Sequence, residues 1–162
     1  MHAIVNEIEA TLGAGFYYVS IAMALSLPDM CAALESADGQ TTGPKYRAWY
    51  NTWLAAKFNN ITAEDMYRLR CGVVHQGRFG HPRMQYSRII FTLPGPNHFH
   101  NNIFDDALNL DARTFCLDIL SVVKAWYDAH AADQIVAENS SKLLQYRPNG
   151  LLPYMFGVAV IA

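Results

Sequence analysis

The chain has 162 residues, of which 52% are hydrophobic and only 16% are charged. This length suits one domain with a sizeable core, and the low charged share predicts that a partner covers part of the surface, most simply a second copy in a homodimer. The net charge of −2 excludes a chain that is basic throughout, as many nucleic-acid-binding proteins are.

The basic side chains are concentrated in the middle third. Residues 42–88 carry eight basic and two acidic side chains, a net charge of +6, whereas the rest of the chain carries four basic and twelve acidic ones, a net charge of −8. This asymmetry indicates either an anionic partner for the middle third or a fold in which that third packs against the acidic ends.

The cysteines and the apolar runs predict a cytoplasmic protein. Cys31, Cys71 and Cys116 are widely spaced and odd in number, without a CxxC pair, which is typical of free thiols in a reducing compartment. No basic segment followed by an apolar run marks a secretory signal. The longest apolar run, residues 151–162, is too short to cross a bilayer, so no membrane association is expected.

The N-terminal part predicts helices. Residues 2–25 place apolar side chains at steps of three and four, which indicates one long amphipathic helix. Gly13 and Gly15 lie inside it and cost roughly 1 kcal/mol each relative to alanine, so a break into two helices is the alternative. The run Ser26-Leu27-Pro28-Asp29 predicts the start of a second, short helix, and residues 36–43 predict a polar loop.

Pro44 opens the next predicted helix, which carries the clearest helical stripe in the chain. Aromatic side chains in such a stripe could stack on nucleobases, but at this spacing they are far more often part of a core or of a dimer interface. The stripe consists of Tyr46, Trp49, Tyr50, Trp53, Leu54 and Phe58.

Residues 62–78 predict a capped helix that is rich in reactive side chains. Thr62 and Asp65 form a start resembling a capping box, and Gly77 is a plausible stop. The side chains expected to face the core are Met66, Leu69 and Val73.

Residues 79–109 predict a small β insertion, with a strand at 86–92 that pairs in a hairpin with residues 98–104. Asp111 is the expected cap of a last long helix that ends near Ala131. The final apolar stretch is expected to cover part of the core or of an interface. The predicted fold is therefore all-α, a single domain over residues 1–162 with four or five helices in a bundle.

Arg70 and His75 are the pair with the chemistry to cleave a phosphodiester. The histidine can move a proton to or from a ribose 2′-hydroxyl or the leaving oxygen, and the arginine can stabilise charge on the phosphorane-like transition state. No metal is needed when the 2′-hydroxyl is the nucleophile. Five residues correspond to about 140° around a helix, so the two side chains converge only if the helix ends near His75 or if two copies meet.

The run Arg70-Cys71-Gly72-Val73-Val74-His75 matches the R-x(4–6)-H motif of the HEPN superfamily. Tyr67 to Cys71 with His75-Gln76-Gly77, and Leu27 to Cys31 with Asp38-Gly39 before an aromatic helix, resemble a group of uncharacterised bacterial HEPN-like proteins. The resemblance implies a dimeric bundle of four or five helices. In active members two copies of the motif face each other and form a metal-independent ribonuclease site.

By this resemblance Arg70 would stabilise the phosphate and His75 would act as acid and base, with Arg68 and Arg78 holding phosphates beside them. Active members usually carry a polar residue directly after the arginine, where this chain has Cys71. The predicted function is thus a metal-independent endoribonuclease or RNA-binding domain that acts at a dimer cleft without a cofactor. The alternative is a non-catalytic dimeric module with an antitoxin-like or assembly partner.

Two other constellations use the same helix. Cys71 and His75 are four residues apart and share a face, so they could bind zinc together with His98 and His100 if that loop folds back. The pair could also form a thiolate nucleophile, although nothing in the sequence indicates an acyl substrate.

Overall fold

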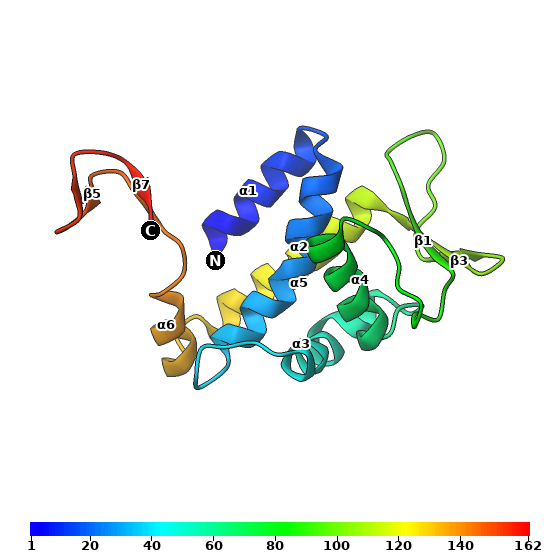
Figure 1. The fold of residues 1–162 in the computed structure, drawn as a ribbon, viewed down its shortest axis with the longest axis horizontal. Coiled ribbons are helices and arrows are strands. Elements are labelled where there is room, and N and C mark those ends of the chain that lie inside the picture. The colour runs from blue at the N-terminus through cyan, green and yellow to red at the C-terminus, as the bar shows by residue number, and fades with distance from the viewer.

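Six α-helices form most of the body of the protein in the computed structural model, which describes residues 1–162 (Figure 1). A π-helical turn (Tyr50–Leu54) and a 3₁₀ turn (Ala55–Lys57) extend the third helix. The helices are α1 (His2–Gly13), α2 (Tyr17–Leu34), α3 (Gly43–Trp49), α4 (Ala63–Gln76), α5 (Ala112–His130) and α6 (Gln134–Ser140).

Strands form three sheets, so the fold is mixed α/β and the prediction of an all-α bundle with one small β insertion is wrong. The first sheet has the order β1-β3-β2, and two further sheets of two strands each lie in the C-terminal residues. The strands are β1 (Arg88–Thr92), β2 (Asn102–Phe104), β3 (Ala107–Asp111), β4 (Tyr146–Arg147), β5 (Gly150–Leu151), β6 (Met155–Phe156) and β7 (Val160–Ile161).

The strand predicted at 86–92 exists as β1, but its partner differs from the prediction. β1 pairs in parallel with β3, and β2 pairs with β3 on the other side, so β1 and residues 98–104 form no hairpin. Burial explains this choice. Leu108 and Leu110 of β3 are fully buried, whereas all three residues of β2 are exposed. The central strand β3 is thus the most deeply buried of the three, with Asn109 and Asp111 buried as well.

The N-terminal residues form two helices where one long helix was predicted. The chain breaks after Gly13, and Gly15 adopts a positive φ of 82°, a conformation that favours glycine. α2 then runs without interruption through Ser26 and Pro28, so the predicted helix start at residues 26–29 is also wrong. The hydroxyl of Ser26 donates to the carbonyl of Ala22, one turn back, and so does not cap a new helix.

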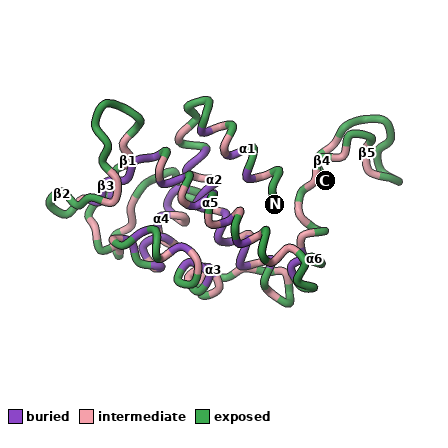
Figure 2. Tube along the Cα trace, turned by 180° about the vertical axis from the view of Figure 1, so that it is seen from behind, coloured by how far each residue is buried: buried purple, intermediate pink, exposed green.

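α2 lies at the centre of the helical body and packs against α1, α3, α4 and α5. Figure 2 shows buried residues along α2 and α5. Trp126 of α5 packs edge-on against Trp49, and its indole N–H donates to a carboxylate oxygen of Glu35 at 2.7 Å. The predicted aromatic stripe is core, because all its members except the half-buried Trp53 are buried.

α2 is also the one helix that is long and apolar enough to cross a membrane by length and composition alone. More than half of it (56%) is buried inside the fold, and core helices of soluble proteins pass the same test. Ser20 and Asp29, both buried polar residues, lie within it. These features are consistent with a soluble protein.

α4 begins and ends as predicted. The Thr62 hydroxyl accepts a hydrogen bond from the backbone N–H of Asp65 at 3.1 Å, and Gly77 closes the helix in the left-handed conformation. Met66, Leu69 and Val73 are buried, as expected from their spacing. α5 likewise begins after Asp111, whose carboxylate accepts from the N–H of Thr114.

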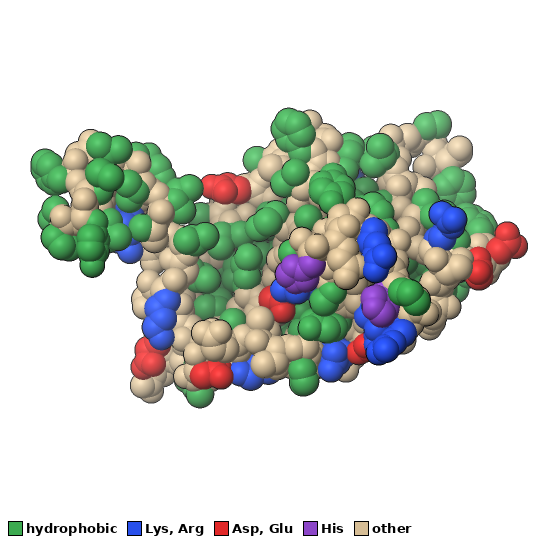
Figure 3. Space-filling view, viewed as in Figure 1, with side chains coloured by type: hydrophobic (Ala, Val, Ile, Leu, Met, Phe, Trp, Pro, Cys, Tyr) green, Lys and Arg blue, Asp and Glu red, His purple; other side chains and the backbone are tan.

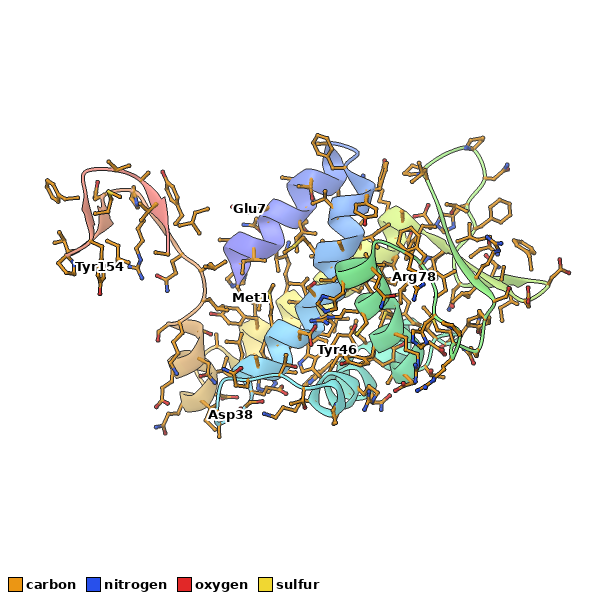
Figure 4. All side chains as sticks on the ribbon, in the orientation of Figure 1. Met1, Glu7, Asp38, Tyr46, Arg78 and Tyr154 are labelled. Atoms are coloured by element: carbon orange, nitrogen blue, oxygen red, sulfur yellow. The ribbon has the colours of Figure 1, made fainter.

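The C-terminal arm, defined here as residues 144–162, extends away from the helical body (Figure 1). It holds the two small sheets β4–β7 and β5–β6, and most of its side chains are exposed. Of the two expected roles for this apolar stretch, covering the core is therefore wrong, and covering part of an interface stays a prediction. Tyr154, labelled in Figure 4, lies in the arm at a distance from every helix.

Candidate functional site

Arg70 and His75 contact each other within one chain, at the C-terminal end of α4. Nη1 of Arg70 lies 2.8 Å from Nε2 of His75. Of the two routes to convergence, the end of the helix is the one that the structure contains, and a second copy is not needed. α4 ends one residue after His75, and the long arginine side chain follows the last turn to reach the imidazole.

The direction of this hydrogen bond defines which ring nitrogen of His75 carries the proton. A guanidinium can only donate, so Nε2 of His75 must accept, and the ring is neutral with its proton on Nδ1. His75 is exposed to solvent. The nitrogen that could act as a base is thus held by Arg70 and is released when the guanidinium finds a stronger acceptor, such as a phosphate oxygen.

Asp29 of α2 holds the other side of the Arg70 guanidinium. Nε of Arg70 lies 2.5 Å from Oδ2 of Asp29, and both side chains are largely buried. Neither of these two atoms makes a hydrogen bond of good geometry, so charge attraction holds the pair together. The hydroxyl of Thr41 donates weakly to Oδ1 of the same carboxylate, at 3.4 Å.

Burial and the charge of the partner have opposite effects on the pKa of each side chain in this pair. Loss of solvent raises the pKa of the Asp29 carboxyl, and the positive charge of Arg70 reduces this effect without cancelling it. For Arg70, burial lowers the pKa, but the charge of Asp29 and the contact with Cys71 outweigh burial, so the pKa is raised overall. The guanidinium is therefore a permanent positive charge at the site.

Asp29 is the member of the site that the sequence interpretation missed. Asp29 belongs to the segment Leu27 to Cys31, which resembles the HEPN-like group, but the sequence interpretation gave it only the role of a residue at a helix start. The available signal was one carboxylate inside a long apolar run of a helix, where a buried charge requires a partner. Cys71 lies beside the pair, with its sulfur 3.9 Å from Nη1 of Arg70, and is half-buried.

Arg68 and Arg78, the two predicted phosphate-binding residues, differ in how free they are. Arg68 pairs with Glu64 one turn earlier on α4, and its Nη1 lies 3.1 Å from Nδ1 of His81. Arg78 is exposed and makes no ion pair, and Figure 4 shows it at the end of α4. Arg78 is thus the better placed of the two to meet a phosphate.

Gly72 allows the chain after α4 to fold back over the helix. A Cβ atom at this position would lie only 2.8 Å from the carbonyl oxygen of Arg78 and 3.3 Å from that of Gly80. The N–H of Arg78 donates to the carbonyl of Gly72 at 3.1 Å. This close backbone approach brings Arg78 beside the turn that carries His75.

The charge asymmetry of the sequence is partly neutralised inside the fold. Five of the eight basic residues between 42 and 88 form ion pairs, three of them with Asp29, Asp38 and Asp118 from outside that stretch. The other three form none and are exposed. Figure 3 shows histidine and basic side chains gathered on the face formed by α4 and the segment after it. The unpaired residues are Arg78, Arg83 and Arg88.

The predicted zinc constellation does not assemble. His98 lies next to Thr114, 3.0 Å from its hydroxyl, and His100 faces Asp118 of α5 at 3.8 Å. Neither reaches Cys71 or His75, and no group of three or more potential ligands is positioned to hold a metal ion. His98 and His100 therefore belong to the junction between the first sheet and α5.

An apolar groove lies beside the end of α4. Its cavity of about 470 Å³ is lined mainly by the start of α2, the segment after α4 and β1. The Tyr18 and Phe79 rings lie 6.5 Å apart, and a Cβ at Gly77 would touch the Tyr18 hydroxyl, so the groove borders the turn after His75. Its most exposed members are Phe16, Tyr18, Val19, Phe79 and Leu93.

The site therefore brings together Asp29, Arg70, Cys71 and His75, with Arg78 on the adjoining turn and Arg68 bound to its own neighbours. Comparison of the chain with family models, with curated proteins and with solved structures found no match. The functional interpretation accordingly depends on the geometry and chemistry of these residues.

Proposed function

We propose that the protein is a metal-independent endoribonuclease or RNA-binding domain with a HEPN-like site at Arg70 and His75. The observation that carries this proposal is the 2.8 Å contact between the two side chains at the solvent-exposed end of α4. Transesterification of RNA requires an acid–base group that solvent can reach beside a fixed positive charge, and the exposed His75 next to Arg70 offers this combination. The unpaired Arg78 adds a charge for a neighbouring phosphate.

The reaction begins when a backbone phosphate reaches the guanidinium of Arg70. A charge-assisted bond to the phosphate competes with the bond to His75 and frees Nε2. Nε2 then takes the proton of the 2′-hydroxyl, the 2′-oxygen attacks phosphorus, and the bond to the 5′-oxygen breaks. The products are a 2′,3′-cyclic phosphate and a 5′-hydroxyl, whose proton comes from water or from the imidazolium of a second copy.

Asp29 is a positioning residue in this scheme. It does not face the substrate, because it is buried on α2 beneath the guanidinium. Its charge holds Nε of Arg70 in place while Nη1 lies beside His75. A homodimer, which we also propose, would place two such sites in one cleft and supply the second proton donor.

The test is cleavage of a mixed-sequence single-stranded RNA in the presence of EDTA, comparing wild type with His75→Ala. We expect cleavage that yields 2′,3′-cyclic phosphate ends with wild type and a loss of at least about 100-fold with the variant, the usual share of a general acid or base. His98→Ala is the matched control, because His98 is exposed but lies away from Arg70. Equal rates in wild type and His75→Ala would remove His75 from the mechanism.

A non-catalytic interaction module is the second candidate, and the Asp29–Arg70 pair favours it. An arginine bound to a buried carboxylate can serve stability alone, by linking α2 to α4. RNA binding without cleavage by clean wild-type protein would support this candidate. For either function we propose a cytoplasmic location, which the free state of all three cysteines supports.

A further inference from the structure

The C-terminal arm is an apolar segment without a partner in the single chain. Among residues 144–162 the only charged side chain is Arg147. Eight of its large hydrophobic side chains are between 47% and 83% exposed. Such a concentration is unusual for a monomer surface and marks an interaction site. These side chains are Leu144, Tyr146, Leu152, Tyr154, Met155, Phe156, Val158 and Ile161.

The apolar groove is the matching concave surface. Phe16 is 62% exposed and Leu93 59% exposed, and both line the cavity. β1, which contributes Phe91 to the wall, has β3 on one side only, so its other edge is free to pair with an added strand. A groove bordered by an open strand edge fits an extended apolar segment rather than a helix.

The arm lies far from the groove of its own chain. In Figure 1 the arm and β1 lie at opposite ends of the longest axis of the molecule. Only residues 141–143 join α6 to the arm, and three residues span at most about 11 Å. The groove of one chain is thus open to the arm of a second copy.

We propose that two copies of this chain exchange their C-terminal arms, each arm lying in the apolar groove and against the free edge of β1 in the other copy. Two-fold symmetry makes the exchange reciprocal and leaves no unfilled groove. Eight large side chains at these exposures offer roughly 800 Å² per arm, taking about 150 Å² per side chain. Two arms, with the groove surfaces they cover, reach the size of a stable interface. The exchange does not depend on the proposed ribonuclease activity.

The first experiment measures molar mass by light scattering during size-exclusion chromatography at micromolar concentration. We expect wild type at twice the chain mass of 18.1 kDa. The arm variant Tyr154→Glu/Phe156→Glu and the groove variant Leu93→Glu should be monomers with unchanged circular dichroism. Leu117→Glu, at an exposed apolar position on α5, is the control and should remain a dimer. A monomeric wild type, or a dimer that persists in both variants, overturns the proposal.

The second experiment identifies what lies in the groove. Chains with Phe156→Cys and chains with Leu93→Cys are mixed and oxidised, in a Cys71→Ser background that removes the one native thiol that is not buried. A disulfide between the two kinds of chain supports the exchange. A dimer without this crosslink, or a crosslink that forms only within a chain carrying both substitutions, overturns it. Flotation of a monomeric wild type with lipid vesicles through the arm would assign the arm to a membrane instead.

Discussion

The carboxylate of Asp29 lies 2.5 Å from Nε of Arg70, and this buried ion pair connects the middle of α2 to the last turns of α4. Through Arg70 the connection continues to His75, 2.8 Å away at the surface. A carboxylate in the core thereby holds a guanidinium that contacts an imidazole in solvent.

Replacing Arg70 with lysine should separate the two contacts that the guanidinium makes. A lysine ammonium is a single point charge and cannot bind Asp29 and His75 together. We expect RNA cleavage to fall by about 10- to 100-fold, in keeping with the loss of a charge-assisted hydrogen bond. Nitrogen-15 NMR should show His75 leaving the Nδ1-protonated form of the wild type. An unchanged tautomer in Arg70→Lys would contradict the assigned bond.

Replacing Asp29 with asparagine should change how stability depends on pH. Because the pKa of Asp29 is raised by burial above its usual value near 3.8, the folded state keeps a proton that the unfolded state has already lost. The free energy of unfolding of wild type should therefore fall as pH rises from 3.8 through the raised pKa. Denaturant titrations at several pH values should show that this part of the slope is absent in Asp29→Asn. An identical slope in both proteins would exclude Asp29 as its source.

Replacing Gly72 with alanine should destabilise the protein, although alanine is the better helix former. The added Cβ meets the backbone carbonyls of Arg78 and Gly80, which cannot move without opening the fold-back. We expect a net loss of about 1–2 kcal/mol in the free energy of unfolding, because the clash exceeds the gain in helix propensity. Gly13→Ala, with open space around it, is the control and should be neutral or stabilising. Equal effects at the two glycines would refute the close approach.

Replacing His100 with glutamine should remove a loss of stability at mildly acidic pH. Burial lowers the pKa of His100 from its usual 6.5, despite the nearby charges of Asp118 and Asp111. Below pH 6.5 His100 binds a proton in the unfolded state but not yet in the folded state. The free energy of unfolding of wild type should therefore fall as pH falls from 6.5 through the lowered pKa. Thermal melts from pH 7.5 to 4.5 test this. A slope that is the same in His100→Gln as in wild type would exclude His100 as its source.

Local signals in the sequence were sufficient to predict the two ends of α4 and the burial of the aromatic stripe. Thr62 and Gly77 act over one helical turn, and the apolar spacing of residues 46–58 does not depend on distant parts of the chain. Pro28 misled the prediction, because its missing N–H and fixed φ mark helix starts on average, while tertiary packing keeps α2 continuous through it. The parallel pairing of β1 with β3 is likewise non-local and depends on which strand can be buried.

The sequence was sufficient to propose Arg70 and His75 as candidate site residues, but not to predict how their side chains are arranged. Residue spacing alone puts Arg70 and His75 on different faces, and only the position of the helix end and the length of the arginine side chain bring them together. Asp29 lies 41 residues earlier in the chain, so its pairing with Arg70 depends on how α2 packs against α4. Side-chain reach and helix packing are tertiary properties, which periodicity does not encode.

The contact of α2 with α5 has a consequence for synthesis of the chain. Trp126 of α5 and Glu35, directly after α2, are 91 residues apart, so the part of α2 that packs against α5 remains uncovered until the ribosome has made α5. During that interval the nascent chain displays an 18-residue helix apolar enough to pass for a membrane span. Folding therefore competes with other fates of the nascent chain. Until α5 is complete, chaperones or other nascent chains can bind the exposed part of α2.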